Sequence, residues 1–212
     1  MFEQRLTQNA KNILGILSRI APTGSYLAGG TALALRLSHR NSYDLDVYSP
    51  VEFGIEEMKQ KLTTEISGFQ LLSSSWQTLQ GKSGDTEISL FYYQYPLLEK
   101  TTQFLNFNIA SIEDIAAMKL EAITGRGLKR DFFDLYKIAE NKKWSLKYML
   151  ELNDRKYSRE GSFTPHILRS LVYFDDAESM SERAAEVEQD WEKVKNFFVQ
   201  EVSATAQTSL SP

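Results

Sequence analysis

The sequence predicts an α/β (α+β) fold in which a small mixed sheet flanked by helices precedes a helical C-terminal part. Three observations support this prediction. Short apolar runs bounded by turn residues, such as Ser25 to Ala28, are typical of buried strands. The run from Thr86 to Tyr93 alternates in the manner of a strand with one buried face. Beyond residue 110, apolar positions recur at a helical period almost to the C-terminus.

The composition is that of an ordinary globular chain. Of its 212 residues, 42% are hydrophobic and 25% are charged, and the absence of cysteine excludes disulfides and thiolate metal sites. The net charge of -4 argues against a surface that binds nucleic acid everywhere, although basic residues gather between Lys119 and Lys143. Because no signal peptide and no membrane-spanning run is recognised, we expect a cytoplasmic protein without a membrane partner.

Before residue 110, helices are expected to alternate with the strands of a sheet. The strand from Phe69 to Leu79 and the strand from Thr86 to Tyr93 are expected to form a hairpin around the polar run GKSGD. The other expected elements are a helix over residues 3–20, a strand over 25–28, a helix ending near Leu37, a strand carrying Asp44 and Asp46, a helix over 54–67 and an extended segment over 104–109.

The second half of the chain is expected to be helical. Ser111 is a helix N-cap candidate, and Gly125 is expected to end that helix. Further helices are expected from Lys129 and over residues 144–157, 163–174 and 181–202. The expected domains are therefore a core over residues 1–108, a helical domain over 109–202 that contributes to the active site, and a disordered tail over 203–212.

Two aspartates lie one residue apart in the stretch YLAGGTALALRLSHRNSYDLDVYSP, residues 26–50. In a strand, Asp44 and Asp46 project from one face about 7 Å apart, whereas Leu45 and Val47 point into a core. Two neighbouring carboxylates repel each other unless a cation lies between them, and Mg²⁺ prefers such oxygen ligands. The alternative is a strand with a merely solvated acidic face.

A glycine-rich turn precedes this strand. Gly29, Gly30 and Thr31 open a short helix whose first backbone N–H groups are a natural cradle for phosphate. A glycine pair alone is more often a plain tight turn, and the spacing of a Walker A loop is absent. A metal pair beside a phosphate cradle, however, is the apparatus of phosphoryl or nucleotidyl transfer.

These motifs together resemble the AbiEii/AbiGii nucleotidyltransferase family. The resemblance rests on the Gly-Gly-Thr turn, on the run Arg40-x-Ser42-x-Asp44-Leu45-Asp46 and on the later run Arg130-Asp131-x-x-Asp134, and extends over roughly residues 10 to 140. It implies a DNA polymerase β-like core and transfer of a nucleoside monophosphate from an NTP to an acceptor hydroxyl. It also implies a toxin that modifies RNA, with tRNA as the expected acceptor, and that is restrained by an antitoxin.

The resemblance also suggests residue roles. Asp44 and Asp46 would hold Mg²⁺ or Mn²⁺, with Glu87 as a candidate third ligand. Nucleotide contacts are expected from Gly29, Gly30, Thr31, Arg40, Ser42, Lys119 and Arg126. Lys119 and Asp131 are expected to take part in catalysis, Lys119 by balancing charge on the departing pyrophosphate and Asp131 as a base or a nucleotide contact. Asp134 is expected to be structural.

Three other readings of the sequence remain open. The chain could be a nucleotide-binding protein that retains the fold without catalysis, because the third carboxylate is uncertain. It could be an interaction module whose helical half binds a protein. It could also be a kinase-type phosphotransferase, because the same metal geometry can present either the α- or the γ-phosphate to attack.

Overall fold

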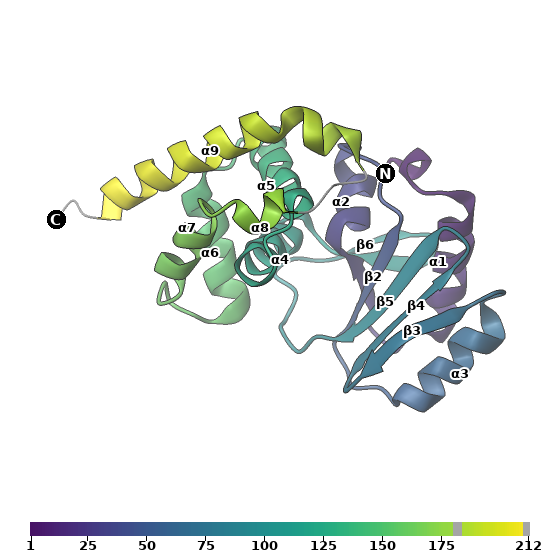
Figure 1. Cartoon of the computed structure of the whole chain (residues 1–212). Helices are drawn as coiled ribbons and strands as arrows, with labels where there is room; N and C mark the ends of the chain where they lie inside the picture. The colour runs from purple at the N-terminus through teal and green to yellow at the C-terminus, as the bar shows by residue number, and fades with distance from the viewer. Residues whose placement is uncertain (180–183, 210–212) are drawn as a thin grey trace. The chain divides into compact units, whose positions relative to one another are not determined.

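A computed structural model describes residues 1–179 and 184–209 of the chain (Figure 1). The chain divides into two compact units, residues 1–111 and residues 112–212. The described part of the second unit contains helices and no strand, so the whole described sheet belongs to the first. No helix within the two described ranges is long and apolar enough to cross a bilayer.

The first unit is built on a seven-stranded sheet in the order β3-β4-β5-β2-β1-β7-β6. The pairs β2–β5 and β1–β7 are parallel, and the other neighbours are antiparallel. The strands are β1 (Tyr26–Ala28), β2 (Asp44–Ser49), β3 (Gln70–Ser75), β4 (Thr78–Ser83), β5 (Thr86–Tyr92), β6 (Thr102–Phe104) and β7 (Phe107–Ile109).

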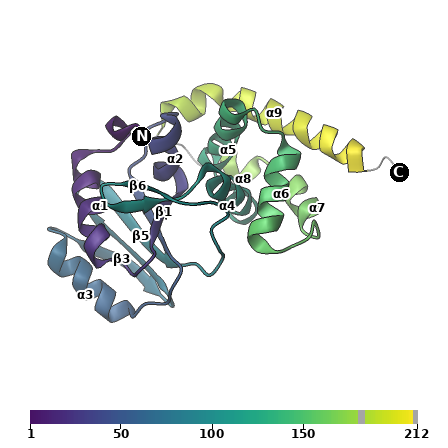
Figure 2. The same ribbon diagram turned by 180° about the vertical axis from the view of Figure 1, so that it is seen from behind.

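One face of the sheet forms the core of the first unit. Leu45, Val47 and Leu90 are at most 1% exposed and lie on this face, where α1 (Gln8–Ile20) and α3 (Ile55–Glu65) pack (Figures 1 and 2). Both helices are amphipathic, and Thr7 caps α1 by accepting a hydrogen bond from the Ala10 N–H. The opposite face of the same strands carries Asp44 and Asp46.

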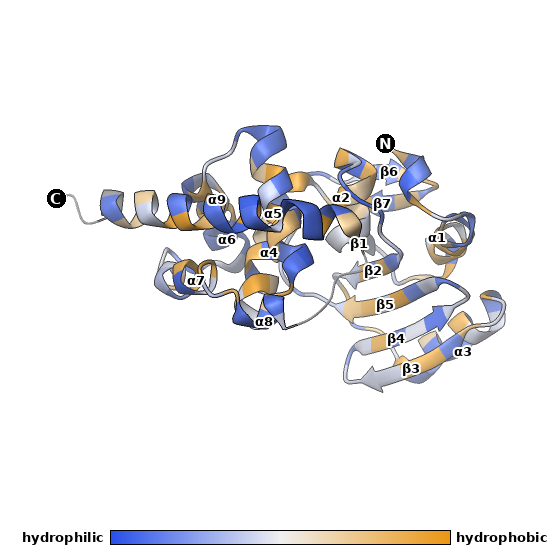
Figure 3. Cartoon of the chain, turned by 45° about the horizontal axis from the view of Figure 1, so that its top comes forward, coloured by the Kyte–Doolittle hydropathy of each residue, from blue (hydrophilic) through white to orange (hydrophobic). Residues whose placement is uncertain are grey.

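The second unit is a helical bundle around α4 (Ile112–Gly125). Most α4 residues are buried, and much of the α4 ribbon is orange in the hydropathy colouring (Figure 3). Phe132 is the centre of an aromatic cluster, with its ring centroid 5.8 Å from that of Trp191 and 5.5 Å from that of Phe198. The other helices are α5 (Lys129–Lys142), α6 (Leu146–Tyr157), α7 (Thr164–Ser170), α8 (Asp175–Glu178) and α9 (Ala185–Ser209).

One expectation about the strands was wrong, and two were right only in part. The expected strand over residues 69–79 is instead a hairpin, because the chain turns at Trp76 and Gln77, where Gln77 takes a φ of 54°. The segment over residues 104–109 contains the short strand β7, which leads to α4 as expected, but its start lies in a second hairpin that turns at Leu105 and Asn106 with φ of 49° and 60°. The run GKSGD is mostly strand: Gly81 to Ser83 belong to β4, and the turn is confined to Gly84 and Asp85.

The helical ends also differ from the expected ones. The first helix begins at Gln8, after a short 3-10 turn over Glu3–Arg5. Residues 203–209 continue α9, so the prediction of disorder from Ser203 onward is wrong for them. The predicted helix start at 181 and the last three residues of the predicted tail lie outside the described residues.

Buried ion pairs join α4 to its two neighbours. Lys119 of α4 lies between two carboxylates of α5, with Nζ 2.8 Å from Asp131 Oδ1 and 2.6 Å from Asp134 Oδ2. Lys156 of α6 lies 2.6 Å from Asp114 of α4, and neither side chain is exposed. Charges removed from water require such partners, so these pairs fix the positions of α5 and α6 on α4.

Removing one member of the Lys156–Asp114 pair should destabilise the second unit far more than removing both. Lys156→Met takes the ammonium away from the buried Asp114 carboxylate and is expected to lower the free energy of unfolding by about 3–5 kcal/mol. Lys156→Met combined with Asp114→Leu is expected to recover most of that loss, because no buried charge is left behind. Urea unfolding followed by circular dichroism measures both effects.

An exposed pair in the first unit provides the control. Lys61 lies 2.7 Å from Glu57, but the two side chains are 44% and 70% exposed. Solvent screens such a pair, so Lys61→Met is expected to leave the free energy of unfolding nearly unchanged. An effect of Lys156→Met no larger than that of Lys61→Met would contradict the structural importance of the buried pair.

The stability contributed by Asp131 should disappear in acid. Burial alone would raise the pKa of Asp131, but the positive charge of Lys119 and the hydrogen bond and charge of Arg126 outweigh it, so that this pKa lies below its ordinary value of 3.8. The contribution is therefore complete above about pH 5 and is lost as the pH falls through the ordinary value toward the lower native one.

Urea unfolding at a series of pH values measures this loss for the wild type and Asp131→Asn. The difference in free energy of unfolding between them should stay constant from about pH 7 to about pH 5 and shrink below about pH 4. The same difference measured for Glu57→Gln, on an exposed carboxylate, is expected to remain small throughout. A wild-type advantage over Asp131→Asn that persists undiminished in acid would contradict the assignment.

Candidate active site

Asp44 and Asp46 project from the same face of β2. Both are half-buried, and they alternate with Leu45 and Val47, which are fully buried on the opposite face. The strand is central in the sheet, with β1 on one side and β5 on the other. The backbone that carries the two carboxylates is therefore held rigidly from both sides.

The N-terminus of α2 (Gly29–Leu37) begins against Asp46. Gly29 takes a φ of 68°, and a Cβ atom at this position would lie 2.5 Å from Asp46 Oδ2. Only glycine combines that conformation with such a close approach. The N-cap residue, Ala28, has no side chain to cap the helix, so backbone N–H groups and the positive end of the helix dipole face this region.

Buried polar side chains support the junction between α2 and β2. Thr31 Oγ1 lies 2.8 Å from Ser42 Oγ and within hydrogen-bond distance of the Asp44 carbonyl oxygen. The Arg40 guanidinium fills the space beside Gly30, and its Nη1 donates to the Asn41 carbonyl at 3.0 Å. Thr31, Arg40 and Ser42 are at most 6% exposed. Their side chains therefore hold the backbone of the site in place from the protein interior.

The neighbouring strand β5 adds two side chains to the aspartate face. In the parallel register, Glu87 lies beside Asp44, and Ser89 lies beside Asp46. Glu87 is exposed and Ser89 is half-buried. Across residues 1–179 and 184–209, no three histidine or carboxylate side chains come together as a metal-binding group. Glu87 as a third metal ligand therefore stays a prediction.

The predicted residues of the second unit also meet one another. Arg126 donates from Nε to Asp131 Oδ2 at 2.9 Å, while Lys119 binds the other carboxylate oxygen of Asp131. Lys119 is 4% exposed, whereas the Arg126 side chain is 54% exposed. The lowered pKa of Asp131 keeps it ionised at neutral pH and makes it a weak proton acceptor. The cluster therefore supports an electrostatic role for Asp131 more than that of a base.

Acidic residues of α9 accompany the basic stretch that the sequence showed. Lys129 Nζ lies 2.9 Å from Glu188, and Lys137 Nζ lies 3.0 Å from Asp190. The basic residues clustered in the sequence therefore predicted a more positive surface than this stretch has in the structure. The sequence did not reveal these ion pairs, because their partners are more than fifty residues apart and carry no motif.

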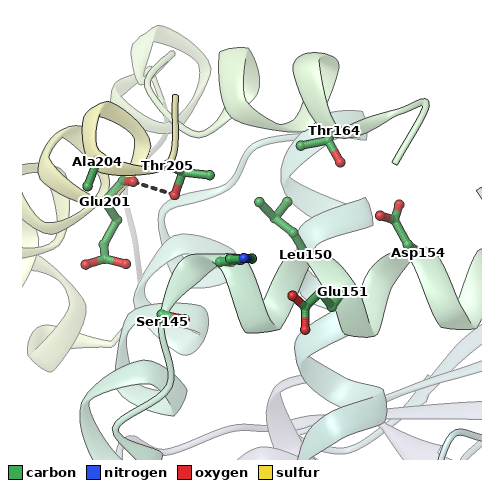
Figure 4. A pocket seen from close by; sticks show the side chains of 9 residues that line it. Ser145, Leu150, Glu151, Asp154, Thr164, Glu201, Ala204 and Thr205 are labelled. Atoms are coloured by element: carbon green, nitrogen blue, oxygen red, sulfur yellow. Dashed lines mark hydrogen bonds between the residues drawn. The ribbon is translucent and has the colours of Figure 1, made fainter. Parts of the chain in front are cut away.

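A pocket of about 620 Å³ lies in the second unit, with lining residues from α6, α7 and α9 (Figure 4). Its lining includes the carboxylates of Glu151, Asp154 and Glu201 and a single cation, Lys147. None of the predicted site residues contributes to it. The excess of negative charge disfavours a triphosphate, so this pocket is not a candidate NTP site.

Comparison with known proteins identifies a family. The chain matches the family described as nucleotidyl transferase AbiEii toxin, Type IV TA system, over residues 87–210. The match begins within β5, so it lies farther toward the C-terminus than the resemblance expected over residues 10–140. The uncharacterized protein aq_aa25 of Aquifex aeolicus is 38% identical over 180 residues, which cover 84% of this chain and 85% of that protein.

Solved structures share the fold at low sequence identity. MenT4, the nucleotidyltransferase toxin Rv2826c from Mycobacterium tuberculosis H37Rv, has a TM-score of 0.51 and 16% identity, with 89% of this chain and 81% of that chain covered. JHP933 from Helicobacter pylori has a TM-score of 0.50 and 17% identity, with 95% and 92% covered. At such identities the likeness shows the fold alone.

Both the family and the fold class predicted from the sequence are confirmed. The family match covers more than half of the chain, and the mixed sheet with flanking helices agrees with it. The chain therefore belongs to the AbiEii nucleotidyltransferase family of toxin–antitoxin systems and is a nucleotidyltransferase.

Proposed function

We propose that this enzyme transfers the nucleoside monophosphate of an NTP to a hydroxyl group of RNA, with tRNA as the expected acceptor, and releases pyrophosphate. We further propose that Asp44 and Asp46 bind Mg²⁺ or Mn²⁺ in this reaction. The observation that carries the proposal is the meeting of two half-buried carboxylates on one strand face with the N-terminus of a helix.

The start of α2 is the proposed phosphate site. Its backbone N–H groups at Gly29, Gly30 and Thr31 have no capping side chain from Ala28, and the helix dipole favours an anion there. The missing side chains of the two glycines let the Asp46 carboxylate and the Arg40 guanidinium lie directly against the start of this helix. The side chains of Thr31, Arg40 and Ser42 hold this backbone in place, as their burial and contacts indicate.

The chemistry of the donor set fits a divalent cation. Asp44 and Asp46 offer carboxylate oxygens from one face of a rigid strand, the kind of ligand that Mg²⁺ prefers. Such an ion would neutralise phosphate charge and lower the pKa of the acceptor hydroxyl. With two protein carboxylates, the remaining ligands would be phosphate oxygens and water, as is usual for Mg²⁺ in nucleotide sites.

RNA as the acceptor is supported by the toxin character of the family. Addition of a nucleotide to a hydroxyl of an RNA would alter the function of that RNA and could thereby stop growth. Membership in a toxin–antitoxin family also implies an antitoxin partner for this chain. A part for Lys119, Arg126 and Asp131 in the transfer reaction stays a prediction. The contacts described for these side chains join them to one another within the second unit.

Loss of either aspartate should abolish transfer. Asp44→Asn and Asp46→Asn are each expected to lower the rate by at least about 100-fold, because they remove a charge that the transition state depends on. The measurement incubates each variant with Mg²⁺, α-phosphate-labelled NTPs in turn and total bacterial RNA, and follows label on RNA. Glu57→Gln, an exposed carboxylate of α3, is the control and should retain full activity.

The labelled position separates the alternatives. Label from the α-phosphate on RNA and release of pyrophosphate support nucleotidyl transfer. Label from the γ-phosphate with release of a nucleoside diphosphate would show a kinase-type reaction instead. Retention of transfer within about threefold in both aspartate variants would overturn the assigned site.

A side chain at residue 29 should disturb the site without unfolding the protein. Gly29→Ala places a Cβ atom 2.5 Å from Asp46 Oδ2 at a φ of 68°, so α2 or Asp46 must move. We expect a loss of activity on the order of 10-fold or more, because small displacements of catalytic groups are costly. Gly15→Ala, where nothing lies within 4 Å of the added Cβ, is the matched control and should keep activity. Equal activities of the two variants would contradict the proposed role of Gly29.

A further inference from the structure

An aromatic row continues the sheet face that carries the two aspartates. Tyr48 follows Asp46 by two residues in β2, so it lies on the same face, about 7 Å further along the strand. In the register with β5, Ser89 lies beside Asp46, and Phe91 lies beside Tyr48. The face therefore changes from carboxylates to rings within two residues of Asp46.

The rings contact one another, and the row is packed at one end, where Tyr48 stacks on the buried ring of Tyr26 with centroids 5.8 Å apart. The centroid of Tyr48 lies 5.3 Å from that of Phe91 and 5.1 Å from that of Tyr93, and Tyr93 lies 5.2 Å from Tyr95. All four rings, which we call the aromatic row, are partly exposed. By contrast, Val47 and Leu90 on the other face of the same strands are at most 1% exposed.

The chemistry of the row favours a base over a phosphate. The four side chains carry no charge, and the hydroxyl groups of the three tyrosines can hydrogen-bond without binding an anion strongly. Aromatic faces that remain partly open are the usual platforms for nucleobases, because every base offers a π-face. A base joined by one sugar to a phosphate held near Asp46 would reach rings that begin two residues further along the strand.

We propose that Tyr48, Phe91, Tyr93 and Tyr95 form a stacking platform for a nucleobase during the reaction. The base is that of the NTP or that at the end of the acceptor RNA. This platform presupposes the nucleotidyl transfer proposed above, and nothing in the family match assigns it. Tyr92 lies between Phe91 and Tyr93 but contacts Trp76, with ring centroids 6.1 Å apart, and therefore serves as an internal control.

Steady-state kinetics of ring variants test the platform. Tyr93→Leu and Tyr95→Leu keep an apolar side chain but remove the ring, and each should raise one KM by about 10- to 100-fold with a smaller effect on kcat. Tyr93→Phe keeps the ring and should restore the wild-type KM. Tyr92→Leu should leave both KM values unchanged. Thermal unfolding of each variant separates lost stacking from lost folding.

The substrate whose KM rises identifies the stacked base. A raised KM for the NTP at saturating RNA assigns the platform to the donor base, and a raised KM for RNA at saturating NTP assigns it to the acceptor. Photocrosslinking provides an independent readout, with 4-thiouridine triphosphate in one arm and an RNA oligonucleotide ending in 4-thiouridine in the other. Mass spectrometry should map the crosslink of one arm to the aromatic row.

The outcomes distinguish this proposal from the one on which it rests. Unchanged KM values in folded Tyr93→Leu and Tyr95→Leu variants, together with crosslinks outside the row in both arms, would overturn the platform. If Asp46→Asn still abolishes transfer in that case, the proposed function stands. If Asp46→Asn retains transfer, the proposed function fails whatever the rings do.

Discussion

The close approach of α2 to β2 is the constraint on which the candidate site depends. Gly29 takes a left-handed conformation and leaves 2.5 Å between a hypothetical Cβ and Asp46 Oδ2, so a helix start and a carboxylate share one small region. That region has positive character from the helix end and negative character from the strand. Buried Thr31 and Ser42 lock the two elements together, which keeps the opposed charges at a fixed separation.

In the second unit, buried charges are stabilised by ion pairs between helices. Its central helix carries lysine and aspartate side chains that are almost wholly removed from water, and each has a partner of opposite charge on α5 or α6. Such pairs add little net stability compared with apolar residues, but they penalise every arrangement that separates the partners. They therefore specify how α5 and α6 dock on α4, which apolar packing alone would leave less defined.

Sequence reasoning predicted most of the first unit because its signals are local. Alternation between Asp44, Leu45, Asp46 and Val47 is visible in four letters, and the glycine pair marks the start of α2. The β3–β4 hairpin was missed because Gln77 adopts a positive φ without glycine, asparagine or proline nearby to signal it. The continuation of α9 to Ser209 was missed because its last residues are small and polar and carry no apolar periodicity.

The parallel pairing of β1 with β7 has a consequence for synthesis of the toxin. Tyr26 at the beginning of the sheet pairs with Asn108 near the end of the first unit, and β2 lies between β1 and the later strand β5. A chain made from its N-terminus cannot close this sheet until β7 has left the ribosome, because long-range pairings form only when both strands are present. The aspartate strand β2 has only one of its two neighbours, β1, until β5 (Thr86–Tyr92) has been made, so its two carboxylates gain their final setting late in the synthesis of the first unit.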